Sequence, residues 1–142
     1  MEWHKSKGII KYDPERGKLK KKPDWWCVVE CDEEITKYYR WWVYKETGIK
    51  LYKPSWGSHI SVIRGEKPWG DLACLWKKYD GLEVEFEYHH FPRISGDTTG
   101  WDRPDCYHFI DIKCDSLMMI RREFDYPCNF GLHMTIGRLW NQ

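Results

Sequence analysis

Apolar and polar residues alternate along this chain with two different periods, one typical of strands and the other of helices. In residues 82–88 every second side chain is apolar, and glutamates fill the positions between them. This period of two predicts a strand of an antiparallel sheet with one face buried. In residues 32–48 apolar positions recur every three to four residues, which predicts a helix that packs on a sheet. Its stripe consists of Ile35, Tyr38, Tyr39, Trp42 and Val43, with Asp32 and Gly48 at the expected ends.

The predicted elements recur in two units of the same order: a strand, a Cys-Asp pair, a helix, a loop and a second strand. The first unit runs from "CVVECDEEI" to "SHISVIRG", and the second runs from "FIDIKCDSL" to "LHMTIGRL". This repeat predicts an α+β fold in which two similar lobes are related by an approximate two-fold axis. We expect a single domain over residues 1–142, with antiparallel sheets lining a central groove and the helices outside. The second strands of the two units would face each other across that groove.

Those two strands carry the same motif, a histidine followed two residues later by a hydroxyl side chain. The motifs are "HISV", with His59 and Ser61, and "HMTI", with His133 and Thr135. Side chains two apart on a strand share a face, so each histidine projects beside its hydroxyl. One imidazole can take a proton from water while the other gives a proton to a leaving oxygen, and the hydroxyls can hold the charge of a phosphate. The four side chains would therefore be the catalytic residues of a reaction that needs no metal.

Composition limits the other possibilities. The chain has 23 basic and 22 acidic residues, so its overall charge of +1 provides no nucleic-acid footprint. Ten tryptophans imply that some rings form core and that others are able to stack on a base. The six cysteines lack metal-ligand spacing and are interpreted as reduced thiols, and we expect no metal and no cofactor. Without a signal peptide or a membrane span, the expected location is the cytoplasm.

On the two motifs the chain resembles the two-histidine phosphoesterase superfamily, whose members carry paired His-x-Ser/Thr-x sequences. The resemblance implies a bilobal, metal-independent phosphodiesterase acting on cyclic nucleotides, 2′,3′-cyclic phosphate RNA ends or 2′-5′ linkages. Phage and viral members include enzymes that degrade cyclic nucleotide immune signals and others associated with RNA repair. The small size and aromatic-rich sequence look similar to phage-type members, for which the location would be the host cytoplasm. Ser61 stands where threonine is commoner in the family.

We therefore predict a hydrolase for a nucleotide phosphodiester, with a nucleotide or an RNA end as substrate. A non-catalytic module that binds single-stranded RNA or sequesters a nucleotide is the alternative. The roles of the two histidines as acid or base, the exact substrate and the oligomeric state stay open. Arg64 and Arg138 follow the motifs at odd spacing, so they should face away from the histidines unless the strands twist or bulge. The candidate substrate contacts are Tyr52, Lys53, Trp56, Arg64 and Arg138.

Overall fold

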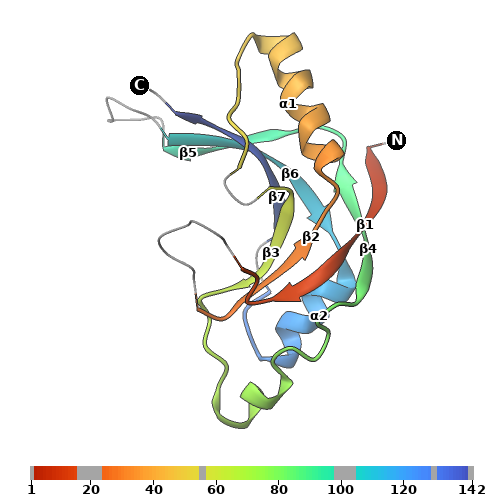
Figure 1. Cartoon of the computed structure of the whole chain (residues 1–142), viewed down its shortest axis with the longest axis vertical. Helices are drawn as coiled ribbons and strands as arrows, with labels where there is room; N and C mark the ends of the chain where they lie inside the picture. The colour runs from red at the N-terminus through yellow and green to blue at the C-terminus, as the bar shows by residue number, and fades with distance from the viewer. Residues whose placement is uncertain (1, 16–23, 55–56, 98–104, 129–130, 141–142) are drawn as a thin grey trace.

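The computed structural model describes residues 2–15, 24–54, 57–97, 105–128 and 131–140 (Figure 1). Seven strands, two α-helices and one 3-10 helix occur within these ranges. In chain order they are β1 (Trp3–Tyr12), β2 (Trp26–Glu30), α1 (Glu33–Thr47), β3 (His59–Arg64), η1 (Gly70–Leu75), β4 (Glu83–His89), β5 (Arg93–Asp97), β6 (Asp105–Lys113), α2 (Asp115–Glu123) and β7 (Leu132–Trp140).

The strands form one antiparallel sheet with the order β4-β1-β2-β3-β7-β6-β5. Strand β4 also pairs with β6, so six strands close into a barrel and β5 extends beyond it on the edge of β6. Closure gives most of the strand edges a hydrogen-bonding partner. The predicted α+β class and antiparallel pairing are confirmed.

The placement of the motif strands differs from our expectation. We predicted that they would face each other across a groove, but β3 and β7 are paired neighbours in the same sheet (Figure 1). Each of these strands buries the apolar residues between its motif side chains. Two strands with the same buried face can therefore pair with each other over one core.

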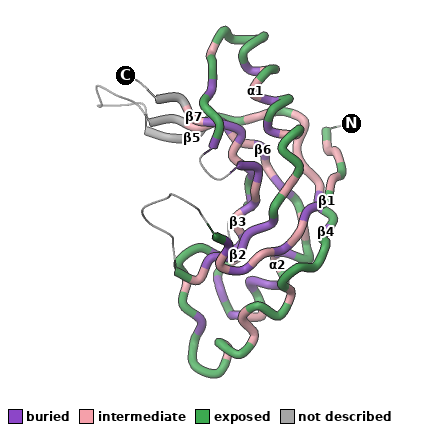
Figure 2. The backbone as a smooth tube through the Cα atoms, in the orientation of Figure 1, coloured by how far each residue is buried: buried purple, intermediate pink, exposed green. Residues whose placement is uncertain are grey.

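The core combines the apolar faces of the strands with one face of each helix (Figure 2). Helix α1 buries Tyr39 and Val43, and Asp32 caps it by accepting a hydrogen bond from the Glu34 amide at 2.9 Å. Tyr38 is an exception to the predicted stripe, because half of its surface is exposed and its ring contacts that of Trp41. One residue corresponds to about 100° of helix rotation, which places Tyr38 at the margin of the stripe.

The helices exchange partners between the two sequence units. Helix α1 belongs to the first unit and packs against β7, whereas α2 belongs to the second unit and packs against β3. Each motif strand is therefore supported by the helix of the other unit. No helix in the described part of the chain is long and apolar enough to span a membrane. Within the same part, the described cysteine side chains are free thiols: Cys27, Cys31, Cys74, Cys114 and Cys128.

Candidate active site on the paired motif strands

The two motifs meet at a single point of the sheet, where Ile60 of β3 pairs with Met134 of β7. Both side chains are fully buried beneath the ladder. Because the strands are antiparallel, the residue before Ile60 lies opposite the residue after Met134, and the reverse. His59 is therefore opposite Thr135, and Ser61 is opposite His133. Opposite residues on a sheet face lie about 5 Å apart at Cβ and diagonal ones about 7–8 Å apart. The two histidines are therefore diagonal neighbours, and the two hydroxyl residues occupy the other diagonal.

A pocket of about 300 Å³ opens over this arrangement. Its lining contains all four predicted catalytic residues, so the structure brings them to one cavity. Three charged side chains complete the wall together with Val62: Arg64, Glu66 and Arg121. Comparisons with family models, with curated proteins and with solved structures found no match to this chain.

His59 is held by its own loop and by β2. Its Nδ1 lies 3.0 Å from the Gly57 carbonyl oxygen. A carbonyl can only accept, so Nδ1 carries a proton and Nε2 is the nitrogen that can exchange a proton with a ligand. The fully buried Trp26 ring stands edge-on to His59, with the two centroids 5.8 Å apart, and its indole nitrogen donates to Ser61 Oγ at 3.4 Å. One tryptophan thus orients both residues of the first motif.

His133 lies in a more apolar setting on β7. Its ring centroid lies 5.4 Å from that of Phe109 and 6.1 Å from that of Tyr107. Part of the residue faces solvent, but the aromatic rings of β6 remove water from one side of the imidazole. This desolvation lowers the pKa of His133, while the charge of the cross-strand neighbour Asp111 acts in the opposite direction. The lowered pKa keeps this ring neutral near pH 7, as a proton acceptor should be.

Each motif strand contains one extra residue directly after its hydroxyl residue, at the last position of the motif. The register between β2 and β3 shifts at Val62, and the register between β6 and β7 shifts at Ile136. Such a bulge reverses the alternation of the side chains that follow it. Arg64 therefore lines the pocket, and the Arg138 guanidinium lies 5.8 Å from the centroid of Tyr107, the ring that also contacts His133. Both arginines share the face of the histidines, which the odd spacing allowed only if the strands twisted or bulged, and the register shifts show that they bulge.

Among the predicted contacts that the structure describes, Arg138, Tyr52 and Lys53 are not part of the pocket lining. Tyr52 is exposed and forms a two-way backbone bridge with Arg138, with N–O distances of 2.8 and 2.9 Å. Lys53 is exposed and pairs with Glu33 at 4.0 Å. Trp56 lies outside the described residues.

Four residues near the site were not among the predicted contacts: Trp26, Glu66, Tyr107 and Arg121. Arg121 had a recognisable signal, because it shares the apolar face of its helix with Leu117, Ile120 and Phe124. An arginine on such a face implies a buried partner, and its carboxylate partner is Glu66. The contacts of Trp26 and Tyr107 depend on strand pairing, and that of Glu66 depends on the packing of α2 beside β3; none of the three leaves a local pattern in the sequence.

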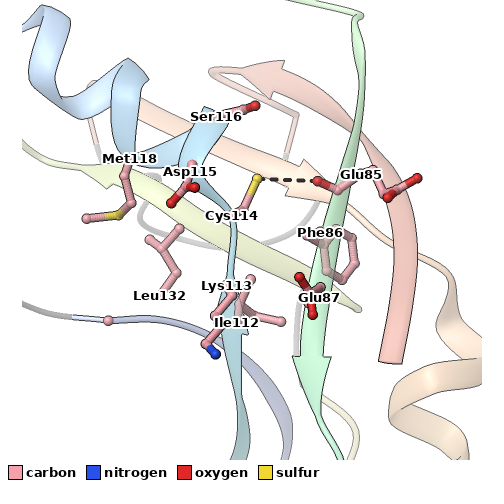
Figure 3. A pocket seen from close by; sticks show the side chains of 11 residues that line it. Glu85, Phe86, Glu87, Ile112, Lys113, Cys114, Asp115, Ser116, Met118 and Leu132 are labelled. Atoms are coloured by element: carbon pink, nitrogen blue, oxygen red, sulfur yellow. Dashed lines mark hydrogen bonds between the residues drawn. The ribbon is translucent and has the colours of Figure 1, made fainter. Parts of the chain in front are cut away.

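A larger pocket, of about 470 Å³, has a different character (Figure 3). It lies where β4 and β6 separate beside the start of α2, and Cys114 Sγ donates to the Glu85 carbonyl across it at 3.4 Å. Its lining carries three carboxylates, those of Glu85, Glu87 and Asp115, and one ammonium, that of Lys113, so its net negative charge would repel a phosphate. Among the described residues, no group of three or more His, Cys, Asp or Glu side chains could hold a metal ion.

Proposed function

We propose that this chain is a phosphodiesterase that hydrolyses a nucleotide phosphodiester by acid–base catalysis between His59 and His133. The candidate substrates are a cyclic nucleotide, a cyclic oligonucleotide and an RNA end with a 2′,3′-cyclic phosphate. The observation that carries the proposal is the pairing of two His-x-Ser/Thr strands at Ile60 and Met134 beneath one shared pocket.

The same proposal includes the bilobal form of the two-histidine phosphoesterases. Residues 58–64 and 132–138 share their buried positions, with a buried residue at the first, third, fifth and sixth places of each stretch. Each stretch also has its bulge at the same place after the histidine. An approximate two-fold axis through the paired residues Ile60 and Met134 would relate the two halves and exchange one motif with the other.

In the proposed reaction, neutral His133 removes a proton from water as the water oxygen bonds to phosphorus. The bond from phosphorus to the leaving oxygen breaks, and protonated His59 gives its Nε2 proton to that oxygen. Because Nδ1 donates to the Gly57 carbonyl, Nε2 is the His59 nitrogen that is left to meet the leaving oxygen. Ser61 and Thr135 donate to the non-bridging oxygens, with Arg64 supplying positive charge.

The test uses His59→Ala and His133→Ala with a panel of cyclic mononucleotides, cyclic oligonucleotides and RNA with a cyclic-phosphate end, followed by chromatography. Each substitution should lower kcat by about 10²–10⁴-fold. His89→Ala is the matched control, because His89 is at the end of β4 and does not line the pocket. Full activity in both pocket variants would contradict the proposal. Tight binding without product would instead identify a module that binds single-stranded RNA or sequesters a nucleotide.

A further inference from the structure

The two bulges are held by the same kind of contact. Arg121 of α2 donates from Nη1 to the Val62 carbonyl oxygen at 2.8 Å. Arg40 of α1 donates from Nη1 to the Ile136 carbonyl oxygen at 2.9 Å. Each arginine therefore reaches the bulged residue of the strand on which its helix packs. We call these two hydrogen bonds the bulge clamps.

The clamps supply hydrogen-bond donors to the carbonyl groups of the bulged residues. A bulged residue is left out of the regular ladder, and a buried carbonyl without a donor is unfavourable. Val62 and Ile136 are both buried, so water does not readily replace the missing strand partner. A guanidinium from a helix satisfies the carbonyl and ties the position of the bulge to that helix.

The position of the bulge decides where the next arginine points. Without the extra residue, regular alternation would turn Arg64 and Arg138 to the core side of the sheet. We propose that Arg40 and Arg121 are positioning residues whose clamps on the two bulges aim Arg138 and Arg64, respectively, at a bound phosphate-bearing ligand. This inference rests on the proposed function, because it assigns these arginines to a nucleotide in the same site.

The two clamp arginines differ in their burial and in the number of their other contacts. Arg121 is almost fully buried and also binds both carboxylate oxygens of Glu66 at 2.7 Å. Arg40 is half-buried and crosses Gly137, where an added Cβ would lie 3.3 Å from Arg40 Cδ and 2.8 Å from the Tyr52 carbonyl oxygen. The Arg40 clamp is therefore the one that can be removed with less disturbance of the fold.

The experiment measures the Kd of adenosine 3′-monophosphate by titration calorimetry, which requires binding but no turnover. It compares the wild-type chain with Arg40→Met, Arg138→Ala and the double variant. Each single change should raise Kd about 5–10-fold, and the double variant should bind no more weakly than Arg138→Ala alone, because Arg40 acts through Arg138. The cross pair Arg40→Met with Arg64→Ala should give multiplied effects. If Arg121→Met folds, its combination with Arg64→Ala should show the same non-additive effect on Kd as the Arg40–Arg138 pair.

Multiplied effects in the Arg40–Arg138 cycle, or an unchanged Kd in either single variant, would overturn the inference. Urea unfolding of every variant verifies that the Kd values belong to folded protein. If the wild-type chain binds the mononucleotide and shows the non-additive cycle but hydrolyses no member of the substrate panel, the proposed function fails and the clamps stand. If turnover depends on the two histidines while the cycle is multiplicative, the proposed function stands and the clamps fail.

Discussion

The buried ion pair beside the pocket offers the sharpest test of how the site is supported. Glu66 receives two hydrogen bonds of 2.7 Å from the Arg121 guanidinium, whose side chain is 1% exposed, while the Glu66 side chain is 33% exposed. Glu66→Gln keeps the shape of the side chain, removes its charge and turns one acceptor into a donor that faces another donor. The Arg121 charge is then left in the interior without a carboxylate.

The magnitude follows from the burial of the two partners. Removing one partner of a fully buried pair costs about 3–5 kcal/mol. Because a third of Glu66 is exposed, water screens part of the loss, and we expect about 2–3 kcal/mol for Glu66→Gln. For a chain of this size that corresponds to a Tm lowered by about 6–12 °C.

Equilibrium unfolding in urea, followed by tryptophan fluorescence, measures this difference directly. The matched control is Glu83→Gln, because Glu83 pairs with Lys7 at 3.6 Å and both side chains are more than half exposed. That pair should contribute at most about 0.5 kcal/mol. If Glu66→Gln and Glu83→Gln unfold at the same urea concentration with the same slope, the reasoning about the buried pair is refuted.

Two further predictions concern pH and backbone packing. Burial lowers the pKa of both His108 and His133, so the unfolded chain binds more protons and stability should fall as the pH drops below about 6.5. His108→Leu should flatten this fall in urea midpoints measured at pH 7.5 and 5.5, and an unchanged pH dependence would count against it. A Cβ on Gly8 would lie 2.5 Å from the Glu30 carbonyl oxygen, whereas one on Gly131 meets nothing within 4 Å. Gly8→Ala should therefore destabilise the β1–β2 pair by about 1–3 kcal/mol and Gly131→Ala by much less, as thermal unfolding would show; equal effects would contradict the close approach.

Local pattern was sufficient for strand β4, for helix α1 and for the motif geometry. The alternation in residues 82–88 predicted β4, and the three-to-four spacing with Asp32 and Gly48 predicted α1 and its ends. The spacing of two placed His59 beside Ser61 and His133 beside Thr135. These features depend on residues close in the sequence, whose side-chain directions follow from strand and helix geometry alone.

Only the tertiary structure decided that β3 and β7 are neighbours, that the sheet closes through β4 and β6, and that both motif strands bulge. Pairing depends on strands that are distant in the sequence, and a bulge depends on the backbone of the partner strand as much as on its own residues. For this reason the directions of Arg64 and Arg138 were conditional in the sequence, and the contacts of Trp26 and Arg40 had no local signal. The two short motifs thus determine which catalytic side chains the site contains. Bringing them together requires the pairing of β3 with β7 and the helices that pack on these strands.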